Sequence, residues 1–100
     1  MAIASPALRR AQRTIGEHLR DQRKLLGLTA AMVAERASIS VTTLRNIEHG
    51  DNVRLDAFLN VLRVLGMLDA TVEATDPLHT DLGRIRSLDS LPKRVRPRRA

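Results

Sequence analysis

The architecture of this 100-residue chain is encoded most clearly in residues 27–66, GLTAAMVAERASISVTTLRNIEHGDNVRLDAFLNVLRVLG. Within this segment, Thr29 and Ser40 each precede apolar residues at helical spacing, which is the position of a helix N-cap. The spacing predicts a short helix over 29–37, a tight turn, and a second short helix over 41–49. Two helices of this length with so short a connection have the dimensions of a helix-turn-helix unit.

Helices are also predicted on both sides of this unit. Before it, Ser5 and Pro6 form a capped helix start, and the apolar periodicity that follows ends at Gly27. After it, an apolar stripe predicts a helix that ends at Gly66. Over 68–75 the pattern fits either a half-buried strand or a short helix, and we favour the helix. The members of the stripe are Leu55, Phe58, Leu59, Leu62 and Leu65.

The composition favours packed helices over a β-sandwich. Apolar residues make up 43% of the chain, but Phe58 is its one aromatic residue. We therefore expect an all-α fold, a compact domain of four to five helices. With no cysteine and three scattered histidines, the sequence offers no disulfide and no zinc ligand set, so no metal or cofactor is expected. We expect no enzyme, because no phosphate-binding glycine loop, paired-histidine motif or nucleophile elbow is present.

No segment of the sequence suits a membrane. No apolar run approaches the roughly 20 residues of a spanning helix. The residues before Pro6 are too few and too polar for a signal peptide. We therefore expect a cytoplasmic protein without a membrane partner.

The positive charge is concentrated near the C-terminus. The net charge is +6, yet residues 1–76 carry ten basic and nine acidic side chains, whereas residues 77–100 carry seven and two. An excess of basic residues points to a polyanionic partner, and the lack of aromatic stacking residues favours duplex DNA over single strands. We expect a helical extension over 1–13 and a DNA-binding and dimerisation domain over 14–76. The basic tail over 77–100 has too few apolar residues to offset its ordering entropy, so we expect it to be disordered.

The second helix of the helix-turn-helix unit presents a polar face of suitable chemistry for DNA. We expect Leu44 and Ile47 to anchor this helix to the one that follows. Threonine and asparagine offer both donors and acceptors, valine can meet a thymine methyl group, and arginine can fork onto guanine or phosphate. The expected exposed face consists of Val41, Thr42, Arg45, Asn46 and His49.

The quoted segment resembles the Xre family, the phage-repressor type of helix-turn-helix regulator, and the resemblance covers residues 14–66. In this family the second helix of the unit inserts into the major groove. The resemblance implies base contacts at Ser40, Val41, Thr42 and Asn46, with Arg45 as a further candidate. It implies phosphate contacts at Thr29, Ala30, Thr43, Asn52 and Arg54. It also implies an ion pair between Arg23 and Glu48 that orients the recognition helix.

Two positions depart from the family pattern. The turn residue is usually glycine but is Ser38 here, and a left-handed backbone at a non-glycine residue costs on the order of 1 kcal/mol. This cost leaves room for a turn that differs in detail. The glutamine often found early in the first helix of the unit is replaced by Ala30. Its phosphate contact is therefore lost or supplied elsewhere.

The segment after the domain adds a narrower resemblance. The sequence DPLHTDLGRIRSLDSLPKRVR, residues 76–96, is similar to regulators encoded beside HipA-type kinase toxins, the HipB-like antitoxins. This resemblance implies a HipA-type kinase toxin as a protein partner. A solitary regulator, whose basic tail serves as a non-specific DNA grip, is the alternative.

A regulator of this type is expected to act as a homodimer. One recognition helix reaches about 6 base pairs, so useful specificity requires two half-sites roughly one turn apart. We therefore expect a sequence-specific repressor that binds double-stranded DNA and a second copy of itself. Its dimer contact surface is expected at Val61, Val64, Leu65, Met67, Leu68 and Val72.

Overall fold

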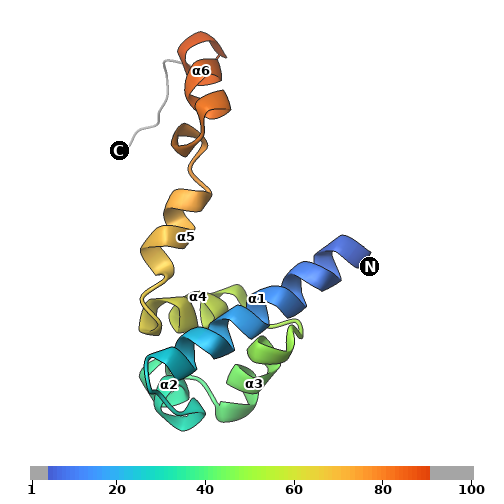
Figure 1. Ribbon diagram of the computed structural model, residues 1–100, viewed down its shortest axis with the longest axis vertical. Helices are drawn as coiled ribbons and strands as arrows, with labels where there is room; N and C mark the ends of the chain where they lie inside the picture. Colours follow the sequence, from blue (N-terminus) through green and yellow to red (C-terminus); the bar gives the residue numbers. More distant parts are fainter. Residues whose placement is uncertain (1–4, 91–100) are drawn as a thin grey trace, which may run out of the picture. The chain divides into compact units, whose positions relative to one another are not determined.

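The computed structural model describes residues 5–90, and every regular element in that range is helical (Figure 1). The predicted all-α fold is therefore confirmed for this part of the chain. The second helix of the helix-turn-helix unit, α3, spans 41–49 as predicted. The segment over 68–75, which fitted either a strand or a helix, forms a helix over 68–74. The elements are α1 (Pro6–Leu25), α2 (Ala30–Arg36), α3 (Val41–His49), α4 (Leu55–Val64), α5 (Leu68–Ala74), the 3-10 helix η1 (Pro77–His79) and α6 (Asp81–Ser90).

The chain divides into two compact units, the first ending at Leu68 and the second beginning at Asp69. The domain bounds expected from the sequence stay a prediction. Residues 6–13 form the first turns of α1. The first unit contains α1 to α4 and holds the helix-turn-helix pair.

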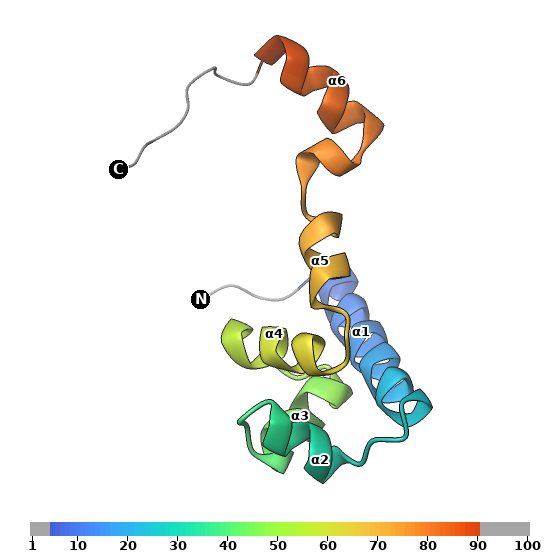
Figure 2. The ribbon, with the colours of Figure 1, turned by 90° about the vertical axis from the view of Figure 1, so that its left-hand side faces the viewer.

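The core of the first unit lies between its four helices. α1 packs against α3, α2 packs against α3, and α4 contacts both α2 and α3 (Figure 2). Phe58 and Leu59 of α4 are half-buried against this core, as is Ile39 of the turn. The buried apolar side chains are Leu19, Val33, Ala34, Ala37, Leu44, Ile47, Val61, Leu62 and Leu65.

The apolar pattern overstates the core at two places. Leu55, the first member of the predicted stripe, is 69% exposed because it lies at the first position of α4. In α1, Leu8 and Ile15 are exposed, and the buried residues are Gly16 and Leu19. The N-terminal half of this long helix therefore contributes little apolar burial.

The helices of the first unit end in one shared hydrogen-bonding pattern. After α2, the Ile39 N–H donates to the Ala34 carbonyl at 3.0 Å, and the Ser38 N–H donates to the Glu35 carbonyl at 3.1 Å. This pair of bonds is a Schellman motif, which places a left-handed residue, usually glycine, just past the helix. Ser38 adopts φ 57°, so the turn keeps the glycine-like backbone at a cost on the order of 1 kcal/mol. The same pattern occurs at Gly27, Gly50 and Gly66.

The contact between α1 and α3 depends on a glycine inside α1. A Cβ atom added at Gly16 would lie 2.6 Å from the carbonyl oxygens of both Ile47 and Glu48. Such a distance is far below van der Waals contact, so the backbones of the two helices approach as closely as they do because residue 16 has no side chain. This glycine sets how the end of α3 lies against α1.

Within the described part of the predicted tail, residues 77–79 and 81–90 are helical, where the sequence predicts disorder. The Asp76 carboxylate accepts a hydrogen bond from the Leu78 N–H at 2.9 Å, and the Thr80 hydroxyl accepts one from the Gly83 N–H at 3.0 Å. Because α6 leaves its apolar side chains in solvent, apolar burial does not account for this helical structure. The local caps are the contacts that favour it. Leu82, Ile85 and Leu88 are 63%, 62% and 85% exposed. Residues 91–100, which carry most of the basic charge of the predicted tail, lie outside the described part of the chain.

Candidate nucleic-acid interface

The helix α3 presents the polar face that the sequence predicts. Leu44 and Ile47 are 1% and 4% exposed and lie in the core, which turns the remaining sides of this short helix outward. Thr42, Arg45 and His49 are exposed, at positions i, i+3 and i+7. Val41 is exposed and Asn46 is half-buried. The expected base-contacting residues thus lie on the accessible part of α3.

Ser40 has a structural function at the start of α3. Its hydroxyl oxygen accepts a hydrogen bond from the Thr43 N–H at 3.0 Å and donates to the Thr43 hydroxyl at 2.9 Å. The N-cap predicted from the sequence is therefore present. Because the hydroxyl proton is already donated within the cap, Ser40 could offer a base only its remaining acceptor capacity.

The expected ion pair between α1 and α3 is present. The Arg23 Nε donates to Glu48 Oε2 at 2.7 Å, and Nη2 donates to Oε1 at 3.2 Å, which makes the pair bidentate. The two side chains are 12% and 9% exposed. Arg23 also donates to the Leu28 carbonyl at 3.1 Å, so one guanidinium joins α1, the loop after it and the end of α3.

Four residues expected to contact bases or phosphates lie around one open hollow. This hollow measures about 410 Å³ and lies between α3, the following loop and the start of α4. These polar side chains lie together beside the exposed face of α3. In this position they can contact the sugar-phosphate backbone that borders a groove. The four residues are Thr43, Asn46, Asn52 and Arg54.

Thr29 and Ala30 are placed apart from this hollow, at the start of α2. The Thr29 hydroxyl accepts a hydrogen bond from the Met32 N–H at 3.1 Å and caps the helix. Ala30 is half-buried against the core and offers only its backbone N–H to an anion. The Ala30 side chain cannot make the phosphate contact that a glutamine side chain would make at this position.

Two partners of the expected phosphate contacts had no signal in the sequence. The Gln12 side-chain amide donates to the Asn52 Oδ1 at 2.8 Å, across 40 residues of chain. Arg54 pairs with Asp56 at 3.0 Å, but both side chains are well exposed and such a pair is weak. The pairing with Asp56 therefore leaves Arg54 free to exchange its partner for a phosphate.

The structure corrects two of the expected dimer-contact residues. Val61 and Leu65 are 0% and 2% exposed, because they belong to the buried core of their own protomer. Neither side chain can form an outer surface. Val64, Met67 and Leu68 are half-buried at the end of the first unit, and Val72 is exposed on α5.

The described residues offer neither a metal cluster nor a membrane span. No group of three or more His, Cys, Asp or Glu side chains within 5–90 is placed to hold a metal ion. No helix in the same range is both long and apolar enough to cross a membrane.

Together, the paired helices, the capped and exposed α3 and the adjoining hollow define a DNA-binding helix-turn-helix regulator. Residues 14–75 match the family model described as a helix-turn-helix domain, and the chain belongs to this family. The comparisons with curated proteins and with solved structures gave no match.

Proposed function

We propose that this chain is a sequence-specific, double-stranded-DNA-binding transcriptional repressor of the Xre type that acts as a homodimer. The observation that carries the proposal is the division of α3 into a buried side, Leu44 and Ile47, and an exposed polar side. The role is one of binding rather than catalysis. It requires the chain to act in the compartment that holds the DNA, which agrees with the expected cytoplasmic location.

The side chains on the exposed part of α3 suit the edges of base pairs in the major groove. Asn46 can bond both N6 and N7 of adenine, Arg45 can fork onto O6 and N7 of guanine, and Val41 can meet the methyl group of thymine. Thr42 offers a donor and an acceptor. In this role Asn52 and Arg54 hold the backbone and set the register of α3.

The homodimer follows from the small reach of one α3. Two copies related by a two-fold axis would place their recognition helices about 34 Å apart, one turn of the duplex. Because Val61 and Leu65 are buried, the contact in the first unit would draw on Val64, Met67 and Leu68. A repressor then acts by occupying a promoter that contains both half-sites.

Thr42→Ala and Asn46→Ala test the base-reading role of α3. Each substitution is expected to weaken binding to a duplex selected from a randomised pool by about 1 to 3 kcal/mol, because a base loses its partner. Binding to an unrelated duplex should stay nearly the same, since phosphate contacts supply non-specific affinity. Electrophoretic mobility shift titrations on the two duplexes measure both quantities.

Glu35→Ala is the matched control, because this exposed side chain belongs to α2 and is not an expected DNA contact. It should leave the ratio of specific to non-specific affinity unchanged. If Thr42→Ala and Asn46→Ala weakened binding to both duplexes equally, these residues would not read bases.

A second candidate, a HipB-like antitoxin, is favoured by the exposed apolar side chains of α6. Leu82, Ile85 and Leu88 recur at i, i+3 and i+6, and more than half of each side chain is exposed. Apolar side chains spaced in this way on a helix can enter a groove on a partner protein. In this candidate the chain binds a HipA-type kinase toxin and represses its own promoter. A solitary regulator lacks that partner.

Co-expression with the product of the adjacent reading frame separates the antitoxin from the solitary regulator. If that product is a HipA-type kinase, it should co-purify with the wild type and be lost from Leu82→Glu/Ile85→Glu, because two buried carboxylates would be costly. Thr42→Ala/Asn46→Ala should retain the kinase while losing specific DNA binding. A kinase that stays with the double glutamate variant would exclude α6 as its binding segment.

A further inference from the structure

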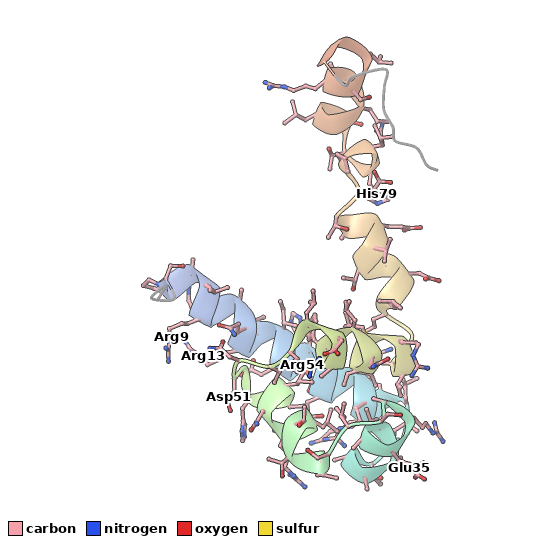
Figure 3. The ribbon with its side chains drawn as sticks, turned by 180° about the vertical axis from the view of Figure 1, so that it is seen from behind. Arg9, Arg13, Glu35, Asp51, Arg54 and His79 are labelled. Carbon is pink, nitrogen blue, oxygen red and sulfur yellow. The ribbon has the colours of Figure 1, made fainter. Side chains whose placement is uncertain are left out.

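A polar hollow of about 310 Å³ lies where the first half of α1 meets the turn after α3. Arg9 and Arg13 of α1 and Asp51 and Asn52 of the turn line it, and Figure 3 shows Arg9, Arg13 and Asp51 at the same end of the first unit. We call this hollow the α1 corner. It shares Asn52 with the hollow that Thr43 and Arg54 line, and its other lining residues differ.

The α1 corner is formed by a close approach of two backbones. Gly50 has φ 83°, and a Cβ atom added there would lie 2.8 Å from the Cα and the N of Arg13. The turn therefore runs directly against α1. As a result Arg9 and Arg13, which are one helical turn apart on α1, line the same hollow as Asn52 of the turn.

The two arginines are available for an anion. Within residues 5–90, neither Arg9 nor Arg13 makes an ion pair or a side-chain hydrogen bond, and both are exposed. Asp51 is the one acidic residue lining the described hollow, so two guanidinium groups outweigh one carboxylate there. Guanidinium groups bind phosphate oxygens in a fork geometry that lysine cannot match.

Gln12 gives Asn52 a defined orientation in the α1 corner. Because Gln12 Nε2 donates to Asn52 Oδ1 at 2.8 Å, the Asn52 carbonyl oxygen is occupied and faces the amide of α1. The NH₂ group of Asn52 keeps both protons for another acceptor, since no described residue takes a bond from it. An anion is the acceptor that also suits the neighbouring arginines.

We propose that the α1 corner binds a backbone phosphate of the duplex beyond the base pairs that α3 reads, with Arg9 and Arg13 as the cations and Asn52 as a neutral donor. Gln12 acts as a positioning residue. The inference rests on the proposed DNA-binding function, because the corner adjoins His49 at the end of α3 and so faces the strand that borders the groove. It extends the DNA contact from the two-helix unit to α1.

The test is the salt dependence of binding to a random-sequence duplex and to the selected duplex. Each neutralised phosphate that is lost makes the slope of log K against log[salt] less steep by about 0.9. Because Arg9 and Arg13 share one phosphate, Arg9→Ala/Arg13→Ala should lower the slope by about 0.9 on both duplexes. Arg10→Ala/Lys24→Ala is the matched control, since it removes the same charge from the same helix at residues that do not line the corner. Its slope should equal that of the wild type.

Gln12→Met isolates the positioning role. This variant keeps the side-chain length but loses the donor, so binding should weaken several-fold at every salt concentration with no change of slope. Circular dichroism should show the same thermal unfolding as the wild type, because residue 12 is only half-buried. An unchanged affinity would remove Gln12 from the proposal.

The outcomes for the inference and for the proposed function are distinct. If the wild type selects a duplex and Arg9→Ala/Arg13→Ala has the slope of its control, the phosphate site is overturned while the proposed function stands. If inorganic phosphate at the concentration of duplex phosphates occupies the α1 corner as well as the duplex does, the corner is a site for free phosphate and not for DNA. If the wild type binds no duplex at all, both fall.

Discussion

Glu48→Gln is expected to lower the free energy of unfolding by about 3 kcal/mol, because it leaves the charged Arg23 side chain nearly buried without a counter-charge. The glutamine keeps the shape of the glutamate, so the loss reports charge and not volume. The two side chains are 12% and 9% exposed, which is why the effect should exceed that of a surface pair. Urea unfolding followed by far-ultraviolet circular dichroism measures it, since the chain has no Trp or Tyr.

Two further variants separate the pair from its surroundings. Asp56→Asn makes the same kind of change in the exposed pair with Arg54 and should cost less than about 1 kcal/mol. Arg23→Met/Glu48→Leu removes both charges and should recover most of the loss, because a buried pair often contributes little net stability over packed apolar residues. If Glu48→Gln cost no more than Asp56→Asn, the pair would not hold α3 against α1.

Gly16→Val is expected to destabilise the first unit by about 3 kcal/mol or more, since the new side chain collides with backbone atoms that cannot rotate away. A Cβ atom at residue 16 would already lie 2.6 Å from the Ile47 and Glu48 carbonyl oxygens. Either α1 and α3 separate, which also strains the Arg23–Glu48 pair, or the end of α3 unwinds. The same urea titration measures the loss.

The controls for Gly16 exploit ordinary helix propensity. Ala11→Val places the same side chain on an exposed position of α1 and should change stability by less than about 1 kcal/mol. Gly16→Ala should destabilise too, although alanine is favoured over glycine by about 1 kcal/mol inside an open helix. A stabilising Gly16→Ala would contradict the close approach of α1 and α3.

The order of the helices could be predicted because its signals are local. Ser40 and Gly50 bracket α3, and a cap residue and a Schellman glycine act within one turn of the chain. The burial of Leu44 and Ile47 follows from helical periodicity in the same way. The Arg23–Glu48 pair was implied by resemblance to the Xre family rather than by any local pattern.

Features that depend on distant packing could not be predicted in this way. The contact of Gln12 with Asn52 joins polar residues 40 positions apart, and no pattern in either segment predicts their pairing. The sequence pattern assigns Val61 and Leu65 to a partner surface, although Leu65 also belongs to the apolar stripe. Both are buried in the structure because the apolar side of α4 is wider than one row. A signal did exist for Gly16, since it lies seven residues, two helical turns, before Arg23 and so shares the α1 face toward α3.

The central claim is that α3 reads the major groove, and methylation interference on the selected duplex tests it most directly. Guanine N7 lies in the major groove and adenine N3 in the minor groove, so methyl groups at these atoms probe the two grooves separately. We predict that N7 methylation blocks binding in two half-sites about one helical turn apart. Part of this interference should disappear with Arg45→Ala. Interference from adenine N3 methylation alone, with every guanine N7 tolerated, would contradict the placement of α3 in the major groove.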